Sequence, residues 1–339
     1  MYYKILREDM KHYAMQYKEG LNIDVKEFDP EPICGGGLFF SDEKNILEFC
    51  DYGNLIADVT VPEDTEVIRV NTKYKAHKII LSNIRFLWDI DVFKQLVEQG
   101  ADIHNEHDKA LSLAIENGGH LPVVEYLAEQ GVDIHAEYDY VLRYAASNGH
   151  LDVVNYLVEQ GADIHAGYDY AIRYAASNGH FDIVNYLVDH GADIHAVNDD
   201  TLRLAAMNGH LRVVEYLIEQ GADIHAEYDE ALICSAANGH LTVVECLVDH
   251  GADIHARYDE TLRLAASNGY LDILKYLVEQ GADIHAEYDE ALRYAAMNGH
   301  LDVVKYLVEQ GADIHARYDE ALRYAAMNGH LDIVEFLKK

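Results

Sequence analysis

The sequence is poor in cysteine, in proline and in basic residues, and these scarcities exclude several classes of protein. Only 4 of the 339 residues are cysteine, and no CxxC pair occurs, so a zinc knuckle is unsupported and free thiols are expected. No apolar run approaches the roughly 18 residues that a membrane helix needs. The start, MYYKILREDMKHY, lacks the apolar core of a secretory signal. We therefore expect a soluble intracellular protein.

The scarcity of basic residues gives the chain a strong negative charge. Lysine and arginine number 26 against 60 aspartates and glutamates, which leaves a net charge of −34. Such a field repels phosphate groups, so neither nucleic acid nor an anionic membrane is expected as a partner. The charge favours basic protein partners during encounter, and it also keeps a long molecule soluble. Both interpretations stay open at this stage.

The main feature of the sequence is an internal repeat of 30 residues that occurs in many successive copies. A clear copy is GADIHAEYDEALRYAAMNGHLDVVKYLVEQ, from Gly281 to Gln310. A slightly longer copy begins at Gly100, where Gly118 and Gly119 replace the single glycine of later copies. The regular copies open on Gly131, Gly161, Gly191, Gly221, Gly251, Gly281 and Gly311. A fixed period of this length is typical of a solenoid, in which each unit contacts mainly its neighbours.

Each unit is predicted to form helix, turn, helix and loop. Asp139 is a candidate N-cap for a first helix that reaches about Ser147, with apolar residues recurring at helical spacing. Asn148 and Gly149 end that helix, because glycine readily adopts the left-handed conformation found at helix ends. A second helix covers Leu151–Gln160, and residues 162–168 form an extended connection to the next unit.

Residues 1–82 do not carry the repeat and are expected to form a small α+β domain. One helix is predicted from an N-cap at Ser41 to Phe49. The expected strands are Tyr2–Ile5, Tyr13–Gln16, Leu21–Val25, Leu38–Phe40, Leu55–Val61, Glu66–Val70 and Ala76–Leu81.

The periodicity changes at Asn83 from about two residues to about 3.6 residues, the period of a helix. A helix is therefore expected from Ile84, and residues 83–339 are assigned to an array of about eight or nine helical pairs. Trp88, the only tryptophan, is expected to pack at the junction with the N-terminal domain. No proline-rich or Gly/Ser-rich linker separates the two parts, so they should be docked rigidly.

The motifs GADIHA, AAxNGH and LDVVxYLVE resemble those of ankyrin repeats, and the resemblance covers residues from about 84 to 339. The fold that it implies is a mainly α ankyrin-repeat solenoid behind the small N-terminal α+β domain. Two departures are visible. Glu290–Arg293 stand where ankyrin repeats usually have T-P-L-H, and the unit is about three residues shorter than usual, which predicts a trimmed or absent β-hairpin finger.

The resemblance implies a non-enzymatic scaffold or adaptor that binds host or viral proteins through the concave face of the array. Units of this length with GADIHAxYD loops are similar to the ankyrin proteins of giant DNA viruses of the mimivirus type. That similarity implies the host cytoplasm, with the virion as a second location and a structural virion role as an alternative function. No cofactor and no metal are expected.

A weaker similarity concerns the N-terminal domain. The segments GLFFSDEKNILEF, LIADVTVPEDTEVIRV and AHKIIL resemble the strand order of ADP-ribosyltransferase-like domains. Ala76, His77 and Lys78 occupy the place where active members carry a catalytic glutamate. The alternative function is therefore an inactive domain of this type, targeted by the array.

Histidines and ion pairs recur with the repeat and are interpreted as structural. The two histidine rows, for example His165 and His180, are expected to bond loop backbone, since adjacent helices lie too far apart for neighbours in a row to share a metal ion. Asp169 and Arg173, four residues apart, represent ion pairs that recur in most units. A row of glutamates that includes Glu290 is expected to be a solvated face.

The candidate partner-binding residues lie where the units are least uniform. Loop tyrosines occupy positions at which ankyrin repeats meet partners, and tyrosine is enriched at binding hot spots; the alternative is that each tyrosine packs on the next loop. Asn198, Asp200 and Ile233 break the pattern and mark either a partner-specific patch or drift. End-to-end self-association through the last unit is a further prediction. The tyrosines are Tyr138, Tyr168, Tyr228, Tyr258, Tyr288 and Tyr318.

Overall fold

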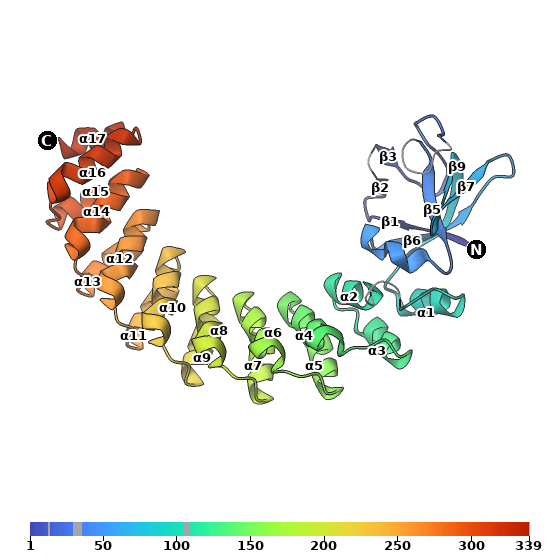
Figure 1. The fold of residues 1–339 in the computed structure, drawn as a ribbon, viewed down its shortest axis with the longest axis horizontal. Coiled ribbons are helices and arrows are strands. Elements are labelled where there is room, and N and C mark those ends of the chain that lie inside the picture. The colour runs from blue at the N-terminus through green and yellow to red at the C-terminus, as the bar shows by residue number, and fades with distance from the viewer. Residues whose placement is uncertain (13, 30–35, 105–108, 339) are drawn as a thin grey trace. The chain divides into compact units, whose positions relative to one another are not determined.

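The computed structural model describes residues 1–12, 14–29, 36–104 and 109–338, with only the backbone for residues 137 and 138. The chain forms two compact units, Met1–Asp163 and Ile164–Lys339, which are described separately. Helices alternate with short turns through most of the chain, and a β-sheet lies near the N-terminus (Figure 1). The fold class is therefore confirmed as mainly α with a small sheet-containing part. Among the described residues, no helix has both the length and the apolar character needed to cross a bilayer.

The first unit begins with a seven-stranded antiparallel sheet in the order β4-β9-β6-β1-β5-β8-β7. A separate hairpin joins β2 (Lys11–His12) to β3 (Met15–Gln16), and a 3-10 helix η1 covers Ile46–Tyr52. Leu6, Phe40 and Leu81 belong to the apolar cluster on one face. The strands of the sheet are β1 (Tyr2–Leu6), β4 (Gly20–Ile23), β5 (Leu38–Asp42), β6 (Leu55–Thr60), β7 (Val67–Val70), β8 (Lys73–Ala76) and β9 (Lys78–Phe86).

The helix predicted from an N-cap at Ser41 is wrong. Ser41 is still in β5, where it pairs with Lys73 of β8, and its hydroxyl donates to the carbonyl of Thr72 at 2.8 Å. These contacts are non-local, so the favourable capping sequence after Ser41 is overridden by the sheet. The helical segment that the structure describes after β5 is η1, which begins later, at Ile46.

The helix predicted from Ile84 is also wrong, because β9 continues to Phe86 and pairs Arg85 and Phe86 with β6. Helix α1 (Ile90–Glu98) begins after Asp89, whose carboxylate accepts the backbone N–H groups of Asp91 and Val92. The division of the chain after residue 82 stays a prediction, although β9 runs through that point.

The first helices of the array pack against the sheet domain within the first unit. Trp88 is 3 % exposed, donates from Nε1 to Asn54 at 2.9 Å and stacks on Phe93 of α1, so its predicted place at the junction is confirmed. Lys109 Nζ donates to the carbonyl of Glu48 in η1 at 2.9 Å. The helices that follow α1 are α2 (Lys109–Glu116), α3 (Leu121–Glu129), α4 (Ala136–Asn148) and α5 (Leu151–Glu159).

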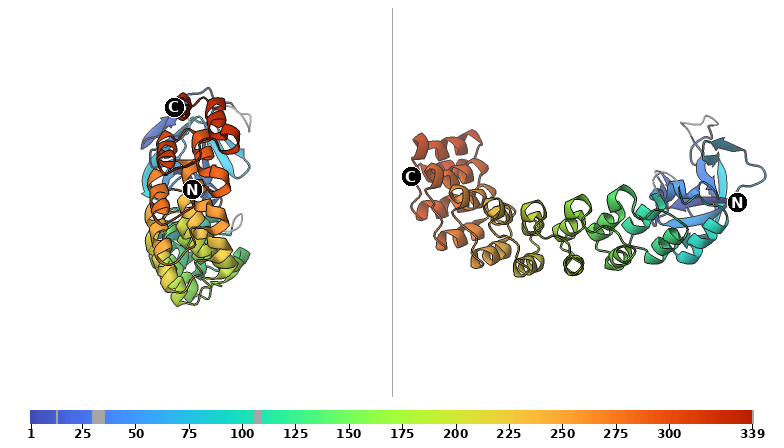
Figure 2. Two further views of the ribbon diagram at one scale, coloured as in Figure 1. Left: turned by 90° about the vertical axis from the view of Figure 1, so that its left-hand side faces the viewer. Right: turned by 60° about the horizontal axis from the view of Figure 1, so that its bottom comes forward.

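The second unit consists of helix pairs in two layers (Figure 2). The first helices of neighbouring repeats pack closely, because small residues such as Ala205 and Ala206 are fully buried between them. The first helices are α6 (Ala166–Ser177), α8 (Ala196–Met207), α10 (Ala226–Ala237), α12 (Ala256–Asn268), α14 (Ala286–Asn298) and α16 (Ala316–Met327). The second helices are α7 (Phe181–Asp189), α9 (Leu211–Glu219), α11 (Leu241–Asp249), α13 (Leu271–Glu279), α15 (Leu301–Glu309) and α17 (Leu331–Leu337).

Each first helix starts with three successive residues in the left-handed region. In α8 these are Val197, Asn198 and Asp199, with φ between 56° and 57°. The extended connection predicted before each first helix is therefore wrong: the chain makes a turn and then this left-handed segment. Left-handed backbone costs roughly 1–2 kcal/mol per L-residue, so other contacts must hold it. No hairpin finger occurs in the loops among the residues that the structure describes.

The glycine that ends each first helix permits close packing between repeats. Gly209 has φ +78°, and a Cβ at this position would lie 2.5 Å from Nδ1 of His240 in the next repeat. The ring of His240 in turn bonds through Nε2 to the carbonyl of Met207 at 3.0 Å. The NGH motif thus combines a left-handed turn with the contact of the following repeat.

We predict that Leu277→Ala in α13 lowers the free energy of unfolding by about 2–5 kcal/mol, because Leu277 is fully buried and its truncation leaves a cavity. Urea unfolding followed by far-UV circular dichroism measures the change. Met327→Ala is the control: this side chain is 80 % exposed and its loss should change stability by under about 0.5 kcal/mol. Equal effects of the two variants would contradict the assignment of the core.

Candidate protein-binding surface

A buried aspartate at the start of the first helices α4, α6, α8, α10, α12 and α14 connects neighbouring repeats. Asp199 Oδ1 accepts a hydrogen bond from Nδ1 of His195 at 2.9 Å and another from the backbone N–H of Asp223, in the next repeat, at 2.8 Å. The same pair of contacts, at the same spacing along the chain, is made by Asp169, Asp229, Asp259 and Asp289. These aspartates are 5–6 % exposed.

This arrangement corrects the predicted N-cap role of Asp139 and its equivalents. Asp139 accepts from Nδ1 of His135 at 2.8 Å and from the N–H of Asp163 at 3.2 Å, and its φ is +52°. The carboxylate is therefore used to hold the left-handed segment and the following loop, instead of the first turn of its own helix. A buried carboxylate needs hydrogen-bond donors from the protein in place of water, and these two N–H groups provide them.

The two histidine rows have different partners. The row of His195 bonds the aspartate carboxylate through Nδ1, so the predicted bond to loop backbone is wrong for the rings of this row. The second row fits the prediction: His210, His300 and His330 bond through Nε2 to the carbonyls of Ser177, Ser267 and Met297, each at 3.0 Å. Among the described residues, no three His, Cys, Asp or Glu side chains are arranged to hold a metal ion.

Arg173, Arg203, Arg263 and Arg293 bond acidic residues other than the aspartate four positions earlier with which each was predicted to pair. Asp169 is left-handed and already bonded, so Arg173 instead reaches Asp200 of the next repeat, with Nε 2.8 Å from Oδ2. Arg203 bonds the same carboxylate, with Nε 2.7 Å from Oδ1. Later in the chain Arg263 pairs with Glu290, and Arg293 pairs with Glu320 at 2.5 Å. These contacts make an ion-pair ladder that runs between repeats.

The acidic members of this ladder are not the solvated face that the sequence predicts. The side chains of Glu290 and Glu320 are 14 % and 15 % exposed, and Arg293 is buried at 3 %. Ile233 replaces an arginine of the ladder. Arg257, from the following loop, supplies the missing cation by binding Glu230 at 2.6 Å.

The loop tyrosines are open to solvent in the described residues. Their exposed fractions are 77 % for Tyr168, 74 % for Tyr228, 75 % for Tyr258, 67 % for Tyr288 and 91 % for Tyr318. Such exposure argues against the alternative in which each tyrosine packs on the next loop. The side chain of Tyr138 lies outside the described residues, so nothing follows for it.

The three irregular candidates differ in accessibility. Asn198 is exposed and donates to Glu227 at 2.6 Å. Asp200 is 5 % exposed and shared by two arginines, and Ile233 is 3 % exposed. The expectation that Ile233 leaves an apolar spot on the surface is wrong, because the side chain enters the packing between repeats.

Two residues that the sequence analysis missed lie over the tyrosines. The guanidinium carbon of Arg317 is 4.9 Å from the ring centroid of Tyr288, and that of Arg257 is 5.8 Å from the ring centroid of Tyr228. Both arginines precede a loop tyrosine directly in the sequence, as RYD. That placement is visible in the sequence, but only the fold shows that each arginine reaches the tyrosine of the preceding repeat.

Comparison with known proteins decides the family. Overlapping matches to the model of ankyrin repeats in three copies together extend from residue 84 to residue 339, which is more than half of the chain. The chain belongs to the ankyrin-repeat family. The matched region includes the histidine rows, the buried aspartates and the loop tyrosines of the ankyrin array described above.

The chain is similar to proteins of Acanthamoeba polyphaga mimivirus, which confirms the resemblance seen in the sequence. Uncharacterized protein R869 is 38 % identical over 125 residues, which are 35 % of this chain and 91 % of that protein. Putative ankyrin repeat protein R229 is 34 % identical over 118 residues, or 32 % of this chain and 38 % of that protein. Putative ankyrin repeat protein R896 is 34 % identical over 131 residues, or 37 % and 39 %. The matches thus cover most of the first relative and about two-fifths of the other two.

We predict that Asp199→Ala lowers the free energy of unfolding by about 1–3 kcal/mol, because His195 Nδ1 and the N–H of Asp223 lose their acceptor in a buried place. Chemical unfolding of the full chain measures the loss. Glu219→Ala, at the exposed end of α9, is the matched removal of a carboxylate and should leave stability nearly unchanged. Equal stability of Asp199→Ala and the unaltered chain would refute the coupling role of the aspartate.

A second prediction concerns the stability of variants in the ion-pair ladder. Arg293→Met should lower stability more than Arg323→Met, because Arg293 is 3 % exposed and its guanidinium bonds Glu320 and the carbonyls of Tyr288 and Glu287. Arg323→Met should cost under about 1 kcal/mol, since that side chain is 57 % exposed and its contact to Glu320 is long, at 3.8 Å. Thermal melting of both variants tests the order, and a larger loss for Arg323→Met would show that the ladder contributes little.

Proposed function

We propose that the ankyrin array is a protein-binding scaffold whose loop tyrosines hold an extended, arginine-rich segment of a partner protein. Ankyrin repeats generally mediate protein–protein interaction and are usually non-enzymatic, which fits the tyrosine row better than a catalytic role. The observation that carries the proposal is the row of exposed tyrosines in which Arg257 and Arg317 already cover two rings. A cation over an aromatic face is attracted by about 0.5–2 kcal/mol.

The arginines of the chain itself indicate what the other tyrosines can accept. Tyr228 and Tyr288 each have an arginine from the next repeat over the ring. After Tyr258 the corresponding position is Glu287, and after Tyr168 it is Val197. These rings thus have no such arginine in the sequence, and a partner's guanidinium could take the equivalent place.

The period of the array limits the conformation of the partner. Packed helices lie about 8–10 Å apart, so equivalent tyrosines in neighbouring repeats recur at roughly that interval. An extended chain advances about 3.3 Å per residue, and three residues therefore match one repeat. The partner segment is expected to be extended, with basic side chains at about every third position.

Charge supports a basic partner. The chain carries a net charge of −34, and Glu227 and Glu287 are exposed directly before Tyr228 and Tyr288. A negative field of this kind increases the rate at which basic partners are encountered, more than it increases final affinity. Affinity would then depend on the tyrosines, because large rigid aromatic side chains dominate binding energy at interfaces.

The other functions suggested by the sequence remain hypotheses. In an N-terminal domain of ADP-ribosyltransferase-like descent, Ala76 would end β8, Lys78 would begin β9 and His77 would lie between the two strands. A structural virion role and end-to-end self-association make no use of the tyrosine row. A location in the host cytoplasm follows from the viral relatives and is part of this proposal.

The test uses a fluorescent (Arg-Gly-Ser)5 peptide, in which arginine recurs every third residue, and the full-length chain. We predict binding in fluorescence anisotropy that weakens at least tenfold in the triple variant Tyr168→Ser, Tyr258→Ser, Tyr318→Ser, since three exposed rings of the row are lost together, including the two to which the sequence supplies no arginine. Tyr174→Ser, which removes a tyrosine outside the row that is 44 % exposed, should change affinity less than twofold.

Two further peptides separate the proposal from general charge attraction. A peptide of the same composition with its five arginines consecutive keeps the charge and loses the spacing, and it should bind several-fold more weakly than (Arg-Gly-Ser)5. A peptide with glutamate in place of arginine should not bind. Equal binding by the triple variant and the unaltered chain, or no binding of (Arg-Gly-Ser)5 at all, would overturn the proposal.

A further inference from the structure

The sheet of the first unit is split between β1 and β5. These strands pair only at Tyr2 with Asp42 and at Tyr3 with Ser41, although both extend further, to Leu6 and back to Leu38. A pocket of about 520 Å³ lies at this split, beside η1 and the β2–β3 hairpin. Its volume is within the range of small-molecule sites, which is about 300–1,000 Å³.

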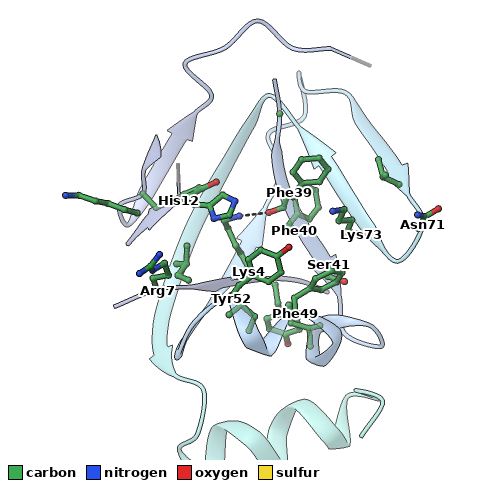
Figure 3. A pocket seen from close by; sticks show the side chains of 18 residues that line it. Lys4, Arg7, His12, Phe39, Phe40, Ser41, Phe49, Tyr52, Asn71 and Lys73 are labelled. Carbon is green, nitrogen blue, oxygen red and sulfur yellow. Dashed lines mark hydrogen bonds between the residues drawn. The ribbon is translucent and has the colours of Figure 1, made fainter. Parts of the chain in front are cut away.

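Lys4 lies in the middle of the split (Figure 3). Its Nζ donates to the carbonyl of Phe39 at 2.6 Å, an acceptor on the part of β5 that no longer pairs with β1. The amine also lies 4.5 Å from the ring centroid of Tyr17. Lys4 is only 8 % exposed, and in the described part of the chain no carboxylate forms an ion pair with it.

Other basic side chains lie near this amine. Lys73 lines the same pocket, with its Nζ 4.5 Å from the ring centroid of Phe39, and it has no ion-pair partner among the described residues. Burial, and then the charge of Lys73, lower the pKa of Lys4 to about 7. Burial, with Lys4 and Arg7 nearby, also lowers the pKa of His12. Each shift means that a positive charge is unfavourable at this position.

This clustering is unusual for so acidic a chain. The basic residues that line the pocket are Lys4, Arg7, Lys11, His12 and Lys73, and no aspartate or glutamate is among the lining residues that the structure describes. Acidic side chains do occur close by, since Glu8, Asp9 and Asp51 line an adjacent hollow. Arg7 is also 4.0 Å from Asp9. The absence of carboxylates is therefore confined to the pocket around Lys4 and Lys73.

The remaining lining is largely aromatic. Phe39, Phe40, Phe49, Tyr17 and Tyr52 contribute rings from β5, from η1 and from the segment after the hairpin. Aromatic walls favour a flat apolar group, and unpaired amines favour a carboxylate or phosphate. We propose that this pocket binds a small organic anion with a planar apolar body, whose charged group is held by Lys4 and Lys73 while its body lies against the aromatic walls.

A purely structural role for Lys4 is the competing explanation, because its bond to Phe39 satisfies a carbonyl at the split. That role accounts for Lys4 alone. It gives no reason for Lys73 to be placed where its charge repels the same amine. An anion would neutralise the repulsion and raise the pKa of Lys4, since a nearby negative charge favours the charged form. The two explanations therefore differ in a measurable way.

The first experiment is calorimetric titration of the full-length chain with phenyl phosphate, benzoate, inorganic phosphate and phenol. We expect one molecule of phenyl phosphate or benzoate to bind per chain, inorganic phosphate to bind at least tenfold more weakly, and phenol not to bind. Failure of both aromatic anions to bind would overturn the proposal. Equal binding of inorganic phosphate and phenyl phosphate would overturn the role of the aromatic walls.

Variants then locate the site. Lys4→Met keeps an unbranched side chain in the buried position and should weaken binding of the aromatic anion at least tenfold, and Lys73→Met should weaken it several-fold. Lys78→Met is the matched control, because Lys78 pairs with Asp64 at 2.7 Å and does not line the pocket. If Lys4→Met proves unstable in thermal melting, Lys73→Met decides alone. Unchanged affinity in Lys73→Met would overturn the proposal.

A second readout follows the amine itself. In NMR of the chain with isotope-labelled lysine, the pKa of Lys4 should be about 7 without ligand and should rise by at least one unit when phenyl phosphate is bound. A merely structural Lys4 would keep the same pKa in both conditions, and that result would contradict the proposal.

Discussion

The array depends on one carboxylate in each repeat from Asp139 to Asp289, which bonds a histidine of its own loop and a backbone N–H of the next loop. Asp199, with His195 on one side and Asp223 on the other, represents the set. The contact holds three left-handed residues whose backbone would otherwise be unfavourable. Because the same carboxylate fixes the loop that follows, the conformation of each repeat is coupled to that of its neighbour, as nearest-neighbour stability in solenoids requires.

This coupling also determines which side chains are left for a partner. The aspartates from Asp139 to Asp289 are buried, and so are Asp200 and Arg293 of the ladder. Positions that look variable and polar in the sequence, such as Asp200, are therefore used within the fold. The left-handed segment directs its tyrosine into solvent. Tyr258 and Tyr318 are therefore exposed because their neighbour in the sequence, Asp259 or Asp319, is engaged with the histidine of the loop.

The repeat predicted the helices of the array well, since the 30-residue period and the glycine turns are local signals. It failed for contacts that cross between repeats. The spacing of Asp169 and Arg173 suggested an ion pair, but the left-handed backbone of Asp169 removes the geometry on which that spacing rule rests. Ile233 looked like a surface exception, whereas Arg257 from another repeat completes the ladder beside it. In the N-terminal domain Ser41 has a good capping sequence, yet pairing with Lys73 places it in a strand. The pocket around Lys4 had no local signal, because it arises where two strands separate.

Coupling of the repeats by the aspartate carboxylates is tested most directly by hydrogen exchange at the backbone amides of Asp223, Asp253 and Asp283. These amides donate to the aspartate of the preceding repeat at 2.8–2.9 Å. If the carboxylates couple the repeats, these three loop amides exchange as slowly as amides within the neighbouring helices and open only when the array unfolds. Exchange at the rate of an unprotected peptide, with the helices still protected, would show that the repeats are not joined by these carboxylates.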